Sequence, residues 1–282
     1  MKKLVIGIIG QGFVGSAIFE GLKNFYDIQT YDIDTKKCNS THYAICNNAD
    51  IIFVCLPTPM KRSGECDISL VENEVKKIEN ACFQLERSPV LVIKSTVPPG
   101  TTAKINECSS LSVCFSPEFL TEANSFEDFK NQTRIIVGGP RPATSVVKQM
   151  FRKAFPEIPI VKTGSNTAEM VKYFINCFLA TKVTFANEIY DICIKSDIDF
   201  DKVTEYALYD NRIGKSHLMV PGPDGDRGFG GHCFPKDLEA LIYFAESLGF
   251  DPTLLKNVLD NNDRIRKNRD WEKMKGRAIS HE

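Results

Sequence analysis

Short apolar runs separated by amphipathic stretches dominate the first half of the sequence. The runs are continuous rather than alternating, which is typical of parallel strands that are buried on both faces of a sheet. We expect strands at residues 4–9, 28–33, 51–56, 90–94, 112–115 and 134–137. Amphipathic helical stretches such as residues 69–85 and 143–153 lie between these runs. This alternation predicts an α/β layer with a doubly wound parallel sheet.

The second half of the sequence has a different character. No Gly or Pro interrupts residues 166–196, and apolar residues recur there at helical spacing, which predicts one long helix. Further helices are expected at 200–208, 236–248 and 252–269, with a loop rich in Gly and Pro over 211–235. We therefore expect a Rossmann-like domain over residues 1–162 and an all-helical domain over 163–282. The long helix is apolar on more than one face, so it predicts a homodimer seam.

Composition narrows the classes of protein to which this chain can belong. Its 282 residues are 43% hydrophobic and 25% charged, the profile of a globular enzyme or binding protein rather than a disordered chain. The formal net charge is −1, which favours neither a nucleic-acid partner nor a membrane surface. No apolar run approaches the ~18 residues that a membrane-spanning helix needs.

The ten cysteines are scattered and contain no CxxC pair or His/Cys cluster with metal-ligand spacing. We expect no metal site. Several cysteines lie inside apolar runs and are expected to pack as small core residues. Reduced thiols in a cytoplasmic protein are the simplest interpretation.

A GxGxxG hexapeptide directly follows the first predicted strand and opens a helix. It reads Gly10-Gln11-Gly12-Phe13-Val14-Gly15. The first glycine permits a tight turn, the second lets a pyrophosphate approach the backbone, and the third permits close packing of helix on strand. Asp32 ends the second strand, where a carboxylate accepts the ribose hydroxyls of NAD and repels the 2′-phosphate of NADP. The alternative is an ordinary glycine turn and a turn-starting acid, which this context disfavours.

Three further loops follow predicted strands, and ligands bind at the carboxyl ends of such strands. They contain Leu56-Pro57-Thr58-Pro59, Lys94-Ser95-Thr96-Val97-Pro98 and Ser116-Pro117-Glu118-Phe119-Leu120-Thr121-Glu122. The first two are as well explained as rigid loops. Glu118 and Glu122 would share a face if their segment were helical, but an ordinary helix start explains the pattern better.

Lys172 and Asn176 lie four residues apart on the predicted long helix. A lysine there could stabilise charge that develops on a substrate oxygen. From the pattern alone, a solvated stripe that includes Glu169 is the favoured interpretation.

The most specific segment is Gly228-Phe229-Gly230-Gly231-His232-Cys233-Phe234-Pro235-Lys236-Asp237. Its glycines allow the backbone to wrap a ligand, and Pro235 suits a first helical turn. Cys233 would then precede a helix N-terminus with Lys236 nearby, and both features favour the thiolate and hence a nucleophile. Asp237 could act as a base or orient a water molecule. The alternative is a cysteine that only packs, like the other nine.

Taken in order along the chain, these motifs resemble the UDP-glucose/GDP-mannose dehydrogenase family. The match includes the GxGxxG fingerprint at residues 10–15 and two loops, here called the Pro-Thr loops, Leu56-Pro57-Thr58-Pro59 and Ser95-Thr96-Val97-Pro98. It also includes Pro117-Glu118-Phe119-Leu120, Lys172 with Asn176, Arg212-Ile213-Gly214 and the Cys233 segment. The resemblance implies two successive hydride transfers to NAD that convert UDP-glucose to UDP-glucuronate through a thioester on a cysteine.

The resemblance also implies the role of each residue. Cys233 would be the nucleophile, Lys172 and Asn176 would bind the substrate oxygen, and Asp237 would order a water molecule. Glu122 and Thr96 would serve thioester hydrolysis, with Glu118 in support. Cofactor contacts are expected from Gly10, Gln11, Gly12, Phe13, Val14, Gly15, Asp32, Lys37, Pro57, Thr58, Ser95, Thr96, Glu122 and Lys236. Contacts with the UDP-sugar are expected from Glu118, Phe119, Leu120, Lys172, Asn176, Arg212, Phe229, Gly230 and Cys233, with Arg212 reaching the partner subunit.

One departure from the family pattern keeps other functions open. Family members usually carry a second Rossmann-like domain that helps to hold the nucleotide, and this sequence stops at residues that resemble the start of that domain. One alternative is a β-hydroxyacid dehydrogenase, which needs no nucleophilic cysteine. The other is a non-catalytic NAD-binding module that needs a partner for the missing domain.

Overall fold

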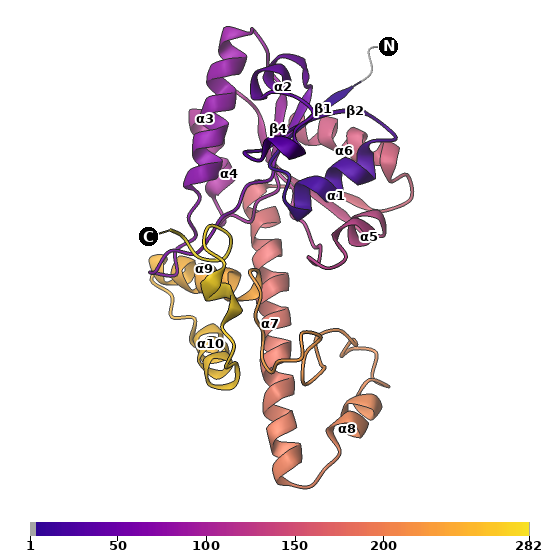
Figure 1. Ribbon diagram of the computed structural model, residues 1–282, viewed down its shortest axis with the longest axis vertical. Helices are drawn as coiled ribbons and strands as arrows, with labels where there is room; N and C mark the ends of the chain where they lie inside the picture. The colour runs from indigo at the N-terminus through magenta and orange to yellow at the C-terminus, as the bar shows by residue number, and fades with distance from the viewer. Residues whose placement is uncertain (1–3, 282) are drawn as a thin grey trace. The chain divides into compact units, whose positions relative to one another are not determined.

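The computed structural model describes residues 4–281, which form two compact units (Figure 1). The first unit comprises the chain up to Thr58 together with Ile68–Lys172. The second unit comprises Pro59–Asp67 together with the chain from Tyr173 onward. The segment Pro59–Asp67 therefore belongs to a different unit from the residues on either side of it. The domain boundary expected after residue 162 stays a prediction.

The first unit is built on a seven-stranded sheet in the order β2-β1-β3-β4-β5-β6-β7. The strands are β1 (Val5–Ile9), β2 (Asp27–Tyr31), β3 (Ile51–Val54), β4 (Val90–Ile93), β5 (Val113–Phe115), β6 (Ile135–Gly138) and β7 (Ile160–Thr163). The first five are parallel, as the continuous apolar runs predict. Every residue of β3 is buried.

The last two strands correct the expectation of a wholly parallel sheet. β6 runs antiparallel to β5, with Phe115 opposite Gly138, and β7 runs parallel to β6. The connection between β5 and β6 covers residues 116–134 and contains one helix of six residues, and the apolar pattern of the sequence does not signal the reversal. β7 was not predicted at all, because its two central residues are exposed and it lacks a continuous apolar run.

Helices cover both faces of the sheet (Figure 1). They are α1 (Phe13–Leu22), α2 (His42–Asn48), α3 (Ser69–Gln84), α4 (Thr101–Cys108), α5 (Ser125–Lys130) and α6 (Ala143–Ala154). One apolar core joins the sheet to α1, α5 and α6 through residues such as Ile18, Phe129 and Phe151. The other joins it to α2 and α3 through residues such as Ile45 and Val75. The predicted doubly wound architecture is confirmed.

The second unit is helical, as expected. Its regular elements are α7 (Ser165–Lys195, which begins in the first unit), α8 (Phe200–Ala207), α9 (Phe234–Ser247), α10 (Thr253–Ile265) and the 3₁₀ turn η2 (Asp270–Lys273). Cys177, Phe229, Leu238 and Val258 form part of its core. α10 ends four residues before the predicted limit, because Arg266 adopts an extended backbone conformation.

The segment Pro59–Asp67 is a small hairpin within the second unit. Met60 pairs with Cys66 across the hairpin and with Ile279 near the end of the described chain. None of the helices between residues 4 and 281 is long and apolar enough to cross a membrane. None of the ten cysteines, all of which lie within residues 4–281, is in a disulfide bond.

Candidate active site

The loop between β1 and α1 contains the three glycines of the predicted fingerprint. A Cβ on Gly15 would lie 1.9 Å from the carbonyl oxygen of Gly10, so helix and strand can approach only without a side chain there. A Cβ on Gly12 would meet no atom within 4 Å, which leaves open space at the start of α1. No side chain caps this end of the helix. Amide groups at such a helix N-terminus favour phosphate, so these residues fit the pyrophosphate of a dinucleotide.

Asp32 follows β2 and faces the same loop. Its Oδ2 accepts a hydrogen bond from the backbone N–H of Gln11 at 2.6 Å, and its Oδ1 accepts one from the N–H of Asp34 at 2.8 Å. The carboxylate is therefore fixed beside the glycine loop, as a ribose-binding acid requires. Lys37, the other residue expected from this connection, is exposed at the end of the 3₁₀ turn η1 (Thr35–Lys37).

The two Pro-Thr loops lie together at the carboxyl ends of β3 and β4. Ser95 Oγ accepts a hydrogen bond from the N–H of Leu56 at 2.9 Å. Thr58 Oγ1 donates to the carbonyl oxygen of Thr96 at 2.7 Å. The two loops are thus tied to each other, while Pro57 stays exposed. Because hydrogen bonds join them, the two loops form a fixed boundary at the edge of the sheet where ligands bind in this type of fold.

A buried cluster of charged groups lies beyond β4 in the first unit. Lys172 Nζ is 2.8 Å from Glu118 Oε1 and donates to the carbonyl oxygen of Glu118 at the same distance. Lys94 Nζ donates to the carbonyl oxygen of Pro117 at 3.0 Å. Burial lowers the pKa of Lys94 to about 8, although the nearby Glu118 carboxylate opposes this shift. Sequence reasoning missed Lys94 as a candidate, because it reads as the end of an apolar strand.

The segment that carries Glu118 and Glu122 is not helical, so neither helical interpretation of it holds. Glu118 Oε2 accepts a hydrogen bond from the N–H of Leu120 at 2.8 Å, a local turn that competes with helix formation. Glu118 is buried, whereas Glu122 is exposed just before α5. Phe119 lies next to the cluster, with its ring centroid 5.8 Å from Lys172 Nζ.

The interpretation of Glu169, Lys172 and Asn176 as a solvated stripe is wrong. Their exposed fractions are 0%, 4% and 6%. Glu169 accepts hydrogen bonds from the N–H groups of Gly100 at 2.7 Å and Thr102 at 2.8 Å, at the start of α4. Burial raises the pKa of Glu169, and these hydrogen bonds oppose the rise. A carboxylate at a helix N-terminus stabilises the dipole, so Glu169 has a structural role on the same helix as the two candidates.

Within the second unit, Asn176 and Asp237 form a buried polar pair with Lys236. Asn176 Nδ2 donates to Asp237 Oδ2 at 2.6 Å, and Lys236 Nζ contacts Asp237 Oδ1. Burial alone would lower the pKa of Lys236, but Asp237, Cys66 and Cys233 outweigh it and the net shift is upward. Lys236 is therefore held as a cation among a carboxylate and two thiols.

Cys233 is the N-cap residue of α9, and Pro235 occupies the first turn. Its thiol lies close enough to Lys236 to affect the lysine pKa. A helix N-terminus and a neighbouring ammonium group both favour the thiolate, so the local structure matches that of an activated cysteine. Cys66 also raises the pKa of Lys236. Sequence reasoning missed Cys66 because it lies in a hairpin that is distant along the chain.

The remaining predicted substrate residues lie in the long loop between α8 and α9. Arg212 has a side chain that is 90% exposed and lies 2.5 Å from Asp210 Oδ2 through its Nη2. Phe229 is buried in the core of the second unit, and its ring packs edge-on against Phe234. Gly230, the next residue, lies directly against the side chain of Arg266. Phe229 therefore anchors the loop in the core of the second unit, and its contact with a UDP-sugar stays a prediction.

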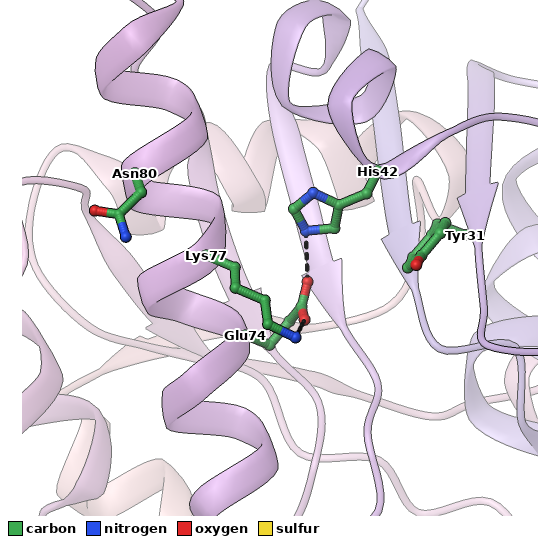
Figure 2. Close-up of a pocket in the computed structure, with 5 residues that line it drawn as sticks. All are labelled: Tyr31, His42, Glu74, Lys77 and Asn80. Carbon is green, nitrogen blue, oxygen red and sulfur yellow. Dashed lines mark hydrogen bonds and ion pairs between the residues drawn. The ribbon is translucent and has the colours of Figure 1, made fainter.

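A separate polar pocket of about 320 Å³ opens between α2 and α3 (Figure 2). It is lined by Tyr31, His42, Glu74, Lys77 and Asn80. His42 Nε2 lies 2.7 Å from Glu74 Oε1, and Lys77 approaches the other carboxylate oxygen at 3.8 Å (Figure 2). None of these residues was predicted to act in a site. Across residues 4–281, no group of three or more His, Cys, Asp or Glu side chains is placed to hold a metal ion.

Comparison with protein families gives two matches along the chain. Residues 37–155 match the NAD binding domain of the UDP-glucose/GDP-mannose dehydrogenase family. Residues 166–264 match the central domain of the same family.

Individual relatives agree with these family matches. A UDP-glucose 6-dehydrogenase of Bacillus subtilis is 35% identical over 226 residues, which are 77% of this chain and 47% of that protein. A UDP-glucose 6-dehydrogenase of Haloferax volcanii is 30% identical over an alignment of 302 positions, gaps included, which covers 92% of this chain and 69% of that protein. The chain thus spans about half the length of the Bacillus relative.

A solved structure of a UDP-glucose dehydrogenase from the archaeon Pyrobaculum islandicum superposes with a TM-score of 0.83. The sequences are 28% identical, and the superposition covers 93% of this chain and 68% of the archaeal chain. The similarity therefore extends through both compact units.

Proposed function

The chain belongs to the UDP-glucose/GDP-mannose dehydrogenase family, and on that premise we propose that it is an NAD-dependent nucleotide-sugar 6-dehydrogenase that oxidises UDP-glucose to UDP-glucuronate. The observation that carries the proposal is the position of Cys233 at the N-terminus of α9, with Lys236 and Asp237 in the turn that follows. A dehydrogenase that stops at an aldehyde or ketone needs no such thiol.

The cysteine has the central role in this proposal. Two NAD molecules, bound one after the other, would each accept one hydride, the first from the alcohol and the second from the covalent adduct. The Cys233 thiolate adds to the aldehyde carbon and forms the C–S bond of that adduct, which becomes a thioester on loss of the second hydride. A water molecule oriented by Asp237 then attacks the thioester, the C–S bond breaks, and the sulfur regains its electron pair.

Lys172 and Asn176 supply polar donors one turn apart on α7. Each can stabilise negative charge on a substrate oxygen. A donor that is already oriented does so effectively, because it needs no reorganisation when the charge develops. The bond between Lys172 and Glu118 and the bond between Asn176 and Asp237 hold both donors in fixed geometry. Thr96 and Glu122 belong to the same proposal as groups that assist thioester hydrolysis.

The NAD preference and the oligomeric state complete the proposal. Asp32 beside the glycine loop favours NAD over NADP. We infer a homodimer through α7, because Phe174, Phe178 and Phe185 are each more than half exposed on this helix. A cytoplasmic location follows from the cysteine usage.

The decisive experiment counts NADH formed per substrate consumed, with UDP-glucose as substrate and GDP-mannose and a free β-hydroxyacid as controls. We expect two NADH and one carboxylate per UDP-glucose, and loss of acid formation in Cys233→Ala. The matched control is Cys108→Ala, which removes an exposed cysteine in α4 and should leave turnover unchanged. One NADH per hydroxyacid with an active Cys233→Ala variant would indicate a β-hydroxyacid dehydrogenase. NAD binding without turnover on any substrate would contradict the proposal and indicate a binding module.

A further inference from the structure

Side chains of helix α10 and of the turn after it form hydrogen bonds with the backbone of the glycine loop that precedes Cys233. Asn262 Oδ1 accepts a hydrogen bond from the N–H of Phe229 at 2.8 Å, and Asn262 Nδ2 donates to the carbonyl oxygen of Phe229 at 3.0 Å. One side-chain amide thus satisfies both backbone groups of a single loop residue, as a neighbouring strand would. Asn262 is 1% exposed, so the alternative for those backbone groups is an unsatisfied buried position.

A second contact lies one turn further along the chain. Gly231 donates its N–H to Asp270 Oδ2 at 3.0 Å, and Asp270 Oδ1 lies 3.1 Å from Arg266 Nη2. Arg266 is 3% exposed and also reaches Asp224 Oδ2 at 2.7 Å and the carbonyl oxygen of Asn268 at 2.8 Å. The guanidinium group therefore fixes Asp270, which fixes the loop.

Two of the loop glycines are shaped to these contacts rather than to a ligand. A Cβ on Gly228 would lie 2.5 Å from Asn262 Oδ1, and a Cβ on Gly230 would lie 2.4 Å from both Arg266 Nη2 and Asp270 Oδ1. Around Gly231, by contrast, a Cβ would meet no atom within 4 Å. At Gly228 and Gly230, protein side chains already fill the space that a Cβ would need.

We propose that Asn262, Arg266 and Asp270, here called the loop clamp, are positioning residues that set where the Cys233 thiol stands at the start of α9. This inference rests on the proposed function, in which Cys233 is the nucleophile. The clamp contacts Phe229 and Gly231, and only His232 separates Gly231 from Cys233, so a shift of the clamped backbone carries directly to the thiol. A displacement of about 1 Å at a reacting group can cost about 100-fold in rate.

Two variants test the clamp with closely matched controls. Asn262→Asp keeps the size of the side chain and the bond from Phe229 N–H, but places an oxygen against the carbonyl oxygen of Phe229. Arg266→Lys keeps the charge but lacks the rigid, planar fork of donors that reaches Asp224, Asp270 and the carbonyl oxygen of Asn268 together. The controls are Asn257→Asp and Arg264→Lys, the same chemical changes at exposed positions of α10. Circular dichroism and NAD affinity report whether each variant is folded.

The main readout is alkylation of Cys233 by iodoacetamide, followed by peptide mass spectrometry across a pH series, with the exposed Cys108 of the same chain as internal reference. We expect Asn262→Asp and Arg266→Lys to change the Cys233 rate about tenfold, the effect of about one unit in a thiol pKa. Acid formation should fall about 100-fold in kcat while KM for NAD stays unchanged. Equal labelling and kcat in clamp and control variants would overturn the inference.

The labelling needs no substrate, which separates failure of this inference from failure of the proposed function. If the wild-type chain forms no acid, the proposed function fails, and the change in the labelling ratio still decides whether the clamp positions the thiol. If Asn262→Asp does not fold, Arg266→Lys gives the same readout. A Cys233 rate that moves together with the Cys108 rate indicates general loosening and also contradicts positioning.

Discussion

The side-chain amide of Asn176 donates to the carboxylate of Asp237 at 2.6 Å, and both groups are buried in the second compact unit. The other oxygen of Asp237 contacts Lys236, so a single carboxylate satisfies an amide and an ammonium group at once. A buried cation is costly without its partner, which makes Asp237 important for folding as well as for the proposed chemistry.

Asp237→Asn should lower the free energy of unfolding by about 3–5 kcal/mol, because it leaves Lys236 buried and uncompensated. The double variant Lys236→Met/Asp237→Asn should recover most of this loss, since it removes both charges. Denaturant unfolding of the wild type, Lys236→Met, Asp237→Asn and the double variant measures the coupling between the two charged groups. The control is Asp251→Asn, which breaks the ion pair with Lys256 on the surface and should change stability little. A double variant that loses as much unfolding free energy as the two single variants together would contradict the pairing.

Asp32 provides a test of cofactor selection. Asp32→Ala removes the carboxylate fixed by the N–H groups of Gln11 and Asp34, and should weaken NAD binding about 10- to 100-fold, the value of hydrogen bonds to a charged group. The preference over NADP should shrink at the same time, because the repelling charge is gone. Calorimetric titration with both dinucleotides measures this. Asp27→Ala, an exposed acid at the start of the same strand, is the control. Unchanged selectivity in Asp32→Ala would count against the ribose contact.

Lys94 predicts a pH dependence of stability with a definite sign. Burial lowers its pKa from an ordinary 10.5 to about 8 in the folded chain. Between these values the unfolded chain holds a proton that the folded chain has lost, so stability contributed by this group rises with pH over this window and is constant below it. The full change corresponds to about 3 kcal/mol.

Comparison with Lys94→Met isolates the effect of this one group. The unfolding free energy of the wild type, relative to Lys94→Met, should increase between pH 8 and pH 10. Lys104→Met removes an exposed lysine of α4 and controls for the loss of a positive charge. A wild-type advantage that falls with rising pH would show that Lys94 is held as a cation by Glu118 instead.

Periodicity and glycine placement made most of the fold predictable. Continuous apolar runs located β1 to β6, and the absence of Gly and Pro located α7, because these patterns report burial and helix formation directly. Strand direction was not predictable in this way, because an apolar run reports burial and not the direction in which β6 runs. β7 was missed because it is an edge strand whose two central residues are exposed.

Buried charge was the main obstacle in the candidate site. Glu169, Lys172 and Asn176 have the spacing of a solvated helix face, and only the tertiary structure shows that they are enclosed. Lys94 and Asn262 were missed for the same reason, since the groups that satisfy them come from distant parts of the chain. Cys233 could be singled out as a candidate because its signal is local: glycines, proline and lysine around one cysteine.

The proposed dimer depends on the aromatic face of α7. Phe178 and Phe185 are 56% and 62% exposed, and Phe178 stacks on Phe174 with ring centroids 6.3 Å apart. Large aromatic side chains anchor interfaces, and replacing a central one costs about 2 kcal/mol or more, which is about 30-fold in dissociation constant. Phe178→Glu/Phe185→Glu should therefore shift the protein to the monomer in sedimentation velocity. The control is Phe83→Glu on α3, which replaces an 82% exposed phenylalanine outside the proposed interface and should leave the dimer intact. A wild type that sediments as a monomer, or a double variant that stays dimeric, would contradict the role of α7.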